Sequence, residues 1–267
     1  MNLFYSPELT SETIHVALPE EESAHAIRVL RMKKSDKVFL TDGKGMFYEG
    51  EIINPHPKKC EVKIIALRPP SHAPRPFHLT IAIAPTKSID RFEWFLEKAT
   101  EIGCDEIFPI SCKHSERTVI KTQRLNKVIV SAMKQCMKSQ LPKLHELTDF
   151  KKFISQEFGE RSSERKPPTL NSKLQTPLLQ KFIGHIPELS ESEFPPKNSQ
   201  DKLLSQVLLR TPNSILIAIG PEGGFSEEEV SLARENGFTA ISLGNSRLRV
   251  ETAGVVACSI VNAMLEV

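Results

Sequence analysis

The chain has 267 residues, of which 39% are hydrophobic and 25% are charged, and its formal net charge is +2. This composition is ordinary for a soluble globular protein. No apolar run approaches the roughly 18–20 residues that a membrane span needs, and the first residues lack the layout of a secretory signal. We therefore expect a cytoplasmic protein, without a membrane partner, that forms one large domain or two modest ones.

The five cysteines are scattered along the chain, without a Cys-x-x-Cys pair and without histidines at zinc-finger spacing. This spacing argues against a structural zinc site and against a disulfide framework. We expect reduced, buried thiols and no bound metal.

The N-terminal part of the chain predicts a small β-barrel. Strands are expected at 38–40, 46–53 and 61–67, and the Asp42-Gly43-Lys44-Gly45 segment between the first two is a strong hairpin turn. One short helix is expected at 24–31. Small strands without long helices are typical of a compact barrel.

A proline-rich segment follows the expected barrel. Four prolines lie among the nine residues from Arg68 to Pro76, and proline cannot continue a helix or a central strand. We interpret 71–76 as a linker between a first domain, 1–70, and a second domain, 77–267.

Strands and helices alternate after the linker. Expected strands are 79–84, 106–110, 181–185, 215–219 and 240–243, and expected helices are 88–102, 123–138, 226–236 and 251–265. Ser226-Glu227-Glu228-Glu229 fits a capping box. Residues 156–176 are polar and lack apolar periodicity, which predicts a mobile insertion. The alternation predicts an α/β domain with a largely parallel sheet.

A glycine-rich loop, Gly220-Pro221-Glu222-Gly223-Gly224, follows the expected strand at 215–219. A ligand can approach such a backbone closely because few Cβ atoms intervene, and ligands of open α/β sheets bind at the carboxyl ends of strands. The alternative is a plain structural turn. A phosphate loop is disfavoured because the Gly-Lys-Ser/Thr ending is missing.

A second loop runs from Leu243 to Ala253, where Gly244 ends a strand and Arg249 and Glu251 stand at the start of the last helix. An arginine held there is a fixed positive charge that could position a phosphate or an anionic base. The alternative is an Arg–Glu surface pair.

Two basic islands, 24–37 and 113–143, contain one acidic residue each, Asp36 and Glu116. They could neutralise phosphates, or they could be solvated helix faces. Together they favour a nucleic-acid partner. The candidate RNA contacts are Arg28, Arg31, Lys33, Lys34, Arg117, Lys121, Arg124, Lys134 and Lys138.

Taken together, the two loops resemble the C-terminal half of the SPOUT methyltransferases, and in particular the RsmE family. The resemblance extends over nearly the whole chain. His25–Arg31 is similar to the family's His-x-x-x-Val-Leu-Arg signature in a PUA-like barrel. Lys98–Gly103 resembles part of its first catalytic-domain helix, and Ser115–Thr118 resembles a middle motif. The chain departs from the family where Val250 replaces a common threonine.

The resemblance implies a parallel sheet with a C-terminal trefoil knot, which is a rare exception among folds, and a homodimer with each active site near the subunit interface. It also implies methyl transfer from S-adenosylmethionine to ring nitrogen 3 of a uridine in the decoding region of 16S ribosomal RNA, in the small ribosomal subunit. The cofactor residues would be Ile219, Gly220, Pro221, Glu222, Gly223, Gly224, Leu243, Gly244, Leu248, Thr252 and Ala253.

The same resemblance suggests catalytic roles for three residues. Arg249 is the candidate for stabilising the anion that develops on the base. Glu101 and Glu251 are candidate proton acceptors, and the alternative for both is a structural ion pair or helix cap.

The sequence disfavours three other functions. A SPOUT ribose 2′-O-methyltransferase shares the fold but differs in its motifs. A non-catalytic RNA-binding assembly factor would need a defective cofactor pocket, whereas both loops are intact. A nucleotide-dependent oxidoreductase lacks the Gly-x-Gly-x-x-Gly fingerprint.

Overall fold

The computed structural model of the chain describes residues 2–69, 75–157, 179–184, 202–209 and 213–265. Most of the predicted linker and nearly all of the predicted insertion at 156–176 lie outside these residues. Two compact units are present, one formed by 1–74 with 127–141 and the other by 75–126 with 142–267. The units are therefore described separately.

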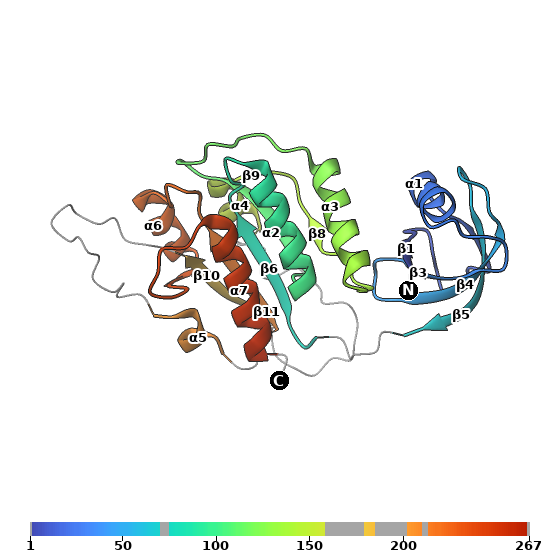
Figure 1. The fold of residues 1–267 in the computed structure, drawn as a ribbon. Coiled ribbons are helices and arrows are strands. Elements are labelled where there is room, and N and C mark those ends of the chain that lie inside the picture. The colour runs from blue at the N-terminus through green and yellow to red at the C-terminus, as the bar shows by residue number, and fades with distance from the viewer. Residues whose placement is uncertain (1, 70–74, 158–178, 185–201, 210–212, 266–267) are drawn as a thin grey trace. The chain divides into compact units, whose positions relative to one another are not determined.

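The first unit contains a five-stranded sheet in the order β1-β3-β4-β5-β2 (Figure 1). Its strands are β1 Leu3–Tyr5, β2 His15–Ala17, β3 Lys37–Thr41, β4 Phe47–Asn54 and β5 Glu61–Arg68. Phe4, Leu40, Tyr48 and Ile52 are almost fully buried in its core. The hairpin is confirmed, because β3 pairs antiparallel with β4 and the Asp42 carboxylate accepts the Lys44 N–H at 2.7 Å.

The helix predicted at 24–31 begins earlier and has two parts. It is α1, Glu20–Ala24, followed by the π-helical turn η1, His25–Val29. Pro19 precedes it, and three glutamates fill the first turn, where the helix dipole favours acidic residues. The prediction placed the start of the helix too late, because the first turn is acidic and lacks apolar residues. The short strands β1 and β2 were not predicted.

Helix α3, Thr122–Gln135, belongs largely to the first unit, since the boundary between the two units lies inside it. Lys127 pairs with Glu21 at 2.5 Å, and Lys134 pairs with Glu22 at 2.5 Å. Past the end of the helix, the Leu141 N–H donates to the Gly43 carbonyl at 2.9 Å. The helix ends three residues earlier than predicted, shortly before Met137, whose φ is +54°.

The second unit is built on a sheet in the order β12-β10-β11-β6-β7-β8, in which every paired strand is parallel. The strands are β6 His78–Ile83, β7 Glu106–Ser111, β8 Lys143–Leu144, β10 Leu179–Gly184, β11 Ser214–Ile219 and β12 Thr239–Ile241. The short β9, Thr148–Asp149, also pairs with β7. The predicted α/β fold with a parallel sheet is confirmed.

Helices cover both faces of this sheet, as a fully parallel sheet requires. Helices α2, Ile89–Ile102, and α7, Val250–Leu265, lie side by side in Figure 1 and contact each other. Helices α4, Phe150–Glu157, and α6, Glu227–Glu235, contribute to a buried cluster with alternate residues of the strands, such as Ala82 and Leu216. A short helix, α5, spans Leu204–Val207. The predictions missed α4, α5, β8 and β9.

Helix α7 follows β12 at one edge of the sheet yet packs on α2, β6 and β11 in its middle. The chain therefore returns across β10 after its last strand. This return is compatible with the predicted trefoil knot, which stays a prediction. Among the described residues, no helix combines the length and apolar character needed to cross a membrane.

Candidate functional site

Three loops meet at the carboxyl edge of the second unit's sheet. They are 84–88 after β6, 112–121 after β7 and 220–226 after β11. Because β11, β6 and β7 are neighbours in the sheet and run parallel, their following loops leave the same edge side by side. Residues that are more than one hundred positions apart in sequence can therefore bond here.

The loop after β6 is held from two sides. The Arg117 guanidinium donates from Nε to the Thr86 carbonyl at 3.0 Å and from Nη2 to the Lys87 carbonyl at 2.5 Å. The Lys87 N–H donates to Glu222 Oε1 at 3.0 Å. Lys87 Nζ also lies 2.8 Å from Glu116. An open, polar pocket at this edge is lined by Lys87, Glu116, Arg117, Thr118 and Val119.

The glycines of the loop after β11 are required by close neighbours. A Cβ at Gly220 would meet the Phe225 ring at 3.0 Å, and one at Gly223 would meet the His114 Cβ at 2.9 Å. Gly224 has a φ of +74° and closes a turn by donating its N–H to the Pro221 carbonyl. Gly220 and Gly223 thus make room for Phe225 and His114, whereas nothing lies within 4 Å of a Cβ added at Gly224, so a ligand can approach the backbone there.

His114 is a residue of this edge that the sequence did not point to. Its Nδ1 lies 3.3 Å from the Gly224 carbonyl, and its side chain is exposed. Nothing in the sequence signalled this contact, because it joins loops that only the order of the strands brings together.

The predicted capping box at the start of α6 is present. Ser226 Oγ accepts the Glu229 N–H at 3.3 Å, and Glu229 Oε2 accepts the Ser226 N–H at 2.8 Å. The other oxygen of this buried carboxylate accepts the Lys113 N–H at 2.8 Å. One glutamate therefore caps α6 and ties it to the loop after β7.

The second predicted loop leads from β12 into α7. Gly244 takes a φ of +145°, and Arg249 is exposed directly before the first residue of α7. Glu251 is buried, and its carboxylate lies 3.9 Å from Nε of Arg91, in the first turn of α2. Glu251 is therefore engaged with α2 rather than forming the surface pair with Arg249 that the sequence left open.

Glu101 is not brought to this edge. It stands at the end of α2 and pairs with Lys98 at 2.9 Å. Two residues later, the Gly103 carbonyl accepts from Asn262, near the end of α7, at 3.2 Å. Since α7 rises about 1.5 Å per residue, Arg249 at its start lies roughly 20 Å from this end. The sequence motif made Glu101 a candidate, but it gave no information on the direction of the helix that contains it.

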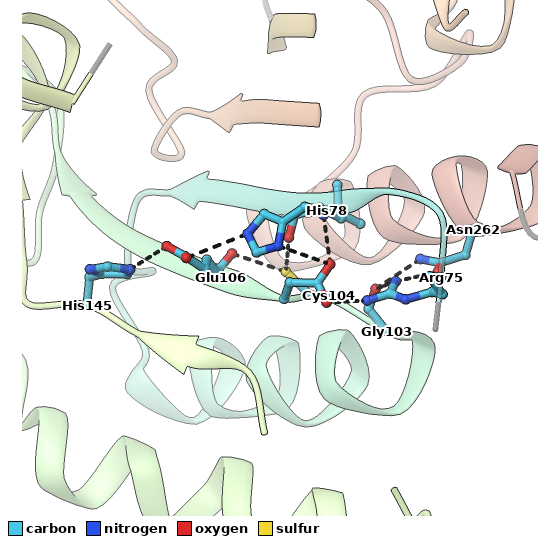
Figure 2. Close-up of polar contacts among 9 residues, drawn as sticks. Arg75, His78, Gly103, Cys104, Glu106, His145 and Asn262 are labelled. Atoms are coloured by element: carbon cyan, nitrogen blue, oxygen red, sulfur yellow. Dashed lines mark hydrogen bonds and ion pairs between the residues drawn. The ribbon is translucent and has the colours of Figure 1, made fainter. Parts of the chain in front are cut away.

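A second polar cluster lies at the opposite, amino edge of the sheet (Figure 2). His145 Nε2 lies 2.8 Å from Glu106, and His78 Nε2 lies 3.6 Å from the same carboxylate. These imidazoles hold the pKa of Glu106 well below its usual range, with the His145 hydrogen bond as the main cause. Arg75 bonds Asp105 at 2.6 Å and also reaches α7 through Asn262. This cluster joins strand beginnings to helix ends, away from the three loops.

The basic candidates fall into two groups. Arg28, Arg31, Lys33, Lys34 and Lys121 are exposed. Arg124 is also exposed but pairs with Glu93 at 2.7 Å, whereas the side chain of Lys134 is 22% exposed and bound to Glu22. Lys138 is half-buried in the first unit.

Three cysteines, Cys60, Cys104 and Cys258, are buried, whereas Cys112 and Cys136 are only partly so, and all five are free thiols. Within the described residues, no group of His, Cys, Asp and Glu side chains is arranged to hold a metal ion.

Two family models match the chain. The model described as an RNA methyltransferase domain matches residues 73–262, and the model described as an RNA methyltransferase PUA domain matches residues 18–65. The PUA match ends before the proline-rich segment 68–76, and the methyltransferase match begins inside it.

Several known proteins are similar over nearly the whole chain. A ribosomal RNA small subunit methyltransferase E from Synechocystis is 28% identical, over 99% of this chain and 78% of that protein. The structure of a probable rRNA-methyltransferase from Porphyromonas gingivalis is 35% identical, covers 100% of this chain and 99% of its own, and has a TM-score of 0.80. A Legionella pneumophila methyltransferase in complex with the cofactor SAM is 25% identical, with a TM-score of 0.76 and coverage of 98% and 96%.

Proposed function

We propose that this chain, which belongs to the RsmE family of S-adenosylmethionine-dependent RNA methyltransferases, methylates ring nitrogen 3 of a uridine in the decoding region of 16S ribosomal RNA. The substrate would be the small ribosomal subunit. The observation that carries the proposal is the meeting of the glycine loop with neighbouring strand-end loops at one edge of the sheet, inside the matched methyltransferase domain.

The cofactor fits this edge. S-adenosylmethionine, when bound, supplies an activated methyl group on a sulfonium. The backbone of Gly220–Gly224 would hold it together with Leu243, Gly244, Leu248, Thr252 and Ala253, because nothing lies within 4 Å of a Cβ added at Gly224 or Gly244. Ile219 ends β11 directly before this loop.

The target nitrogen is a weak acid, so its proton must leave before or during attack on the methyl carbon. Arg249 is exposed at the start of α7 and would stabilise the anion of the base. Of the two candidate proton acceptors, Glu251 lies two residues from Arg249, whereas Glu101 lies at the far end of α2. We therefore retain Glu251 as the candidate proton acceptor and assign Glu101 a structural role in its ion pair with Lys98.

The first unit would hold RNA through its exposed basic residues. Contacts to phosphate fix register and orientation without reading sequence. Arg28 lies in the π-helical turn, and Arg31, Lys33 and Lys34 follow it. All four fall within residues 18–65, which the PUA model matches. Lys121, directly before α3, is a further exposed candidate.

A homodimer is part of the proposal, with each active site near the subunit interface. Helix α7 carries one charged residue, Glu251, and its partly exposed positions include Val255, Val256 and Ile260. Trp94, on the neighbouring α2, is 43% exposed. Exposed apolar surface of this kind is typical of a protein interface. Light scattering should give twice the chain mass, and Val256→Lys should give the single mass.

The function is tested with small ribosomal subunits from a strain that lacks this methylation and with S-adenosylmethionine labelled in its methyl group. We expect the label in 3-methyluridine after nucleoside analysis. Label in a 2′-O-methyl nucleoside, or no label, would overturn the assignment.

The role of Arg249 is tested by Arg249→Ala, with Arg247→Ala, an exposed arginine of the same loop, as the matched control. Arg249→Ala should lower methyl transfer by about 100-fold or more, as removal of a charge-stabilising donor does, with cofactor affinity retained. Equal losses of affinity and rate would show that Arg249 is structural.

A further inference from the structure

Arg117 and Glu222 act on opposite sides of one peptide group. The Thr86 carbonyl and the Lys87 N–H belong to the same peptide plane, and the carbonyl accepts from Arg117 while the N–H donates to Glu222. The positive guanidinium faces the negative end of the peptide dipole, and the carboxylate faces the positive end. Hydrogen bonds to ionised groups are stronger than neutral ones, and aligned bonds polarise each other.

The geometry requires an arginine. Its planar guanidinium donates from Nε to one carbonyl and from Nη2 to the next, Lys87, so that two successive carbonyls are held by one rigid fork. Thr86 is buried, with 1% of its surface exposed. The charge of Arg117 is therefore directed at the backbone of its own unit.

The clamped peptide lies close to the cofactor loop. Strand β6 ends at Ile83, which pairs with Ile219, and Ile219 is followed by the glycine loop that contains Glu222. The Ala84 N–H also donates to the Ile219 carbonyl at 3.0 Å. A peptide that is fixed by Arg117 thus fixes the side chain of Glu222, and with it the middle of Gly220–Gly224.

We infer that Arg117 is a positioning residue that sets the place of the glycine loop through the Thr86–Lys87 peptide and Glu222, and that it does not act as an RNA contact. This replaces the role that its charge suggested in the sequence. The inference rests on the proposed cofactor role of Gly220–Gly224.

The test compares cofactor affinity with RNA affinity. Arg117→Met removes the donors, Glu222→Ala removes the acceptor, and Glu222→Gln keeps an acceptor oxygen for the Lys87 N–H. Lys121→Met changes an exposed lysine at the end of the same loop and serves as the control. Calorimetry measures the Kd for S-adenosylmethionine, and filter binding measures the Kd for a ribosomal RNA fragment at several salt concentrations.

Arg117→Met and Glu222→Ala should each weaken S-adenosylmethionine binding by about tenfold, the effect of losing a hydrogen bond to a charged group. The double variant should be little weaker than either single variant, because both act on one peptide. Glu222→Gln keeps the acceptor oxygen but loses the charge, so it should weaken binding less than Glu222→Ala does. Arg117→Met should leave the salt dependence of RNA binding unchanged, whereas Lys121→Met should reduce its slope by about one.

The opposite pattern would overturn the inference. In one such outcome, Arg117→Met keeps wild-type cofactor affinity but binds RNA more weakly and with a reduced salt slope. In the other, the losses of cofactor affinity in the double variant are additive. Glu222 is exposed, so the Ala and Gln variants provide the comparison even where Arg117→Met fails to fold. A wild-type chain that binds no S-adenosylmethionine would instead reject the proposed function itself.

Discussion

Gly254 sets how closely α7 approaches the sheet and α2. A Cβ added there would lie 2.5 Å and 2.7 Å from two ring carbons of Phe95 and 2.9 Å from Cδ1 of Ile83. Carbon atoms in contact normally lie about 3.5–4.0 Å apart, so the overlap with the ring is about 1 Å. Both side chains are fully buried.

Two effects of Gly254→Ala oppose each other. Alanine should stabilise the helix by up to about 1 kcal/mol, since glycine is the poorer helix former. Overpacking of a tight core costs about 1–3 kcal/mol. We expect overpacking to win, because the clash involves a rigid ring, with a net loss of about 1–2 kcal/mol. The thermal midpoint should then fall by roughly 2–8 °C.

Calorimetric unfolding measures this loss, and Ser259→Ala, at an exposed position of the same helix, is the control that should lose nothing. Phe95→Leu should relieve part of the clash in the double variant. Because Arg249 lies five residues before Gly254, the displaced helix should also transfer methyl groups more slowly. A Gly254→Ala variant as stable as the wild type, or more stable, would refute the packing argument.

Three further changes test the edges of the sheet. Arg75→Met should cost about 2–4 kcal/mol in urea unfolding, because it removes one partner of a mostly buried ion pair with Asp105; a loss under about 0.5 kcal/mol would contradict this role. The low pKa of Glu106 means that its stabilisation is present above its unfolded pKa of about 4.3 and is lost as the pH falls through the folded value. The pKa of His78 is raised, chiefly by its hydrogen bond to Glu106, so its contribution is full below about pH 6.5 and lost above the folded value. Glu106→Gln should therefore destabilise more at pH 5.5 than at pH 8.5, and equal losses would argue against the charge pair. Ser226→Ala should cost about 1 kcal/mol through the lost cap, with Ser231→Ala of the same helix as a neutral comparison.

Much of the architecture followed from local patterns. The hairpin at Asp42–Gly45, the capping box at Ser226 and the alternation of strands and helices are properties of a few neighbouring residues, and all were predicted. The glycines at 220, 223 and 224 also indicated a loop that disfavours side chains at these positions. Local turn chemistry and apolar periodicity suffice for such features, because the interactions involved span only a few positions.

Contacts between distant segments were decided only by the tertiary structure. Strand β10 lies between β11 and β12, although it precedes both in the chain. Long crossovers between parallel strands allow such an order. The order of the strands brought Arg117 to the peptide beside Glu222, and the direction of α2 carried Glu101 away from Arg249. The sequence by itself determined which residues could do the chemistry. The sheet order and helix directions decided which of them meet, since residues that meet through space need share no pattern along the chain.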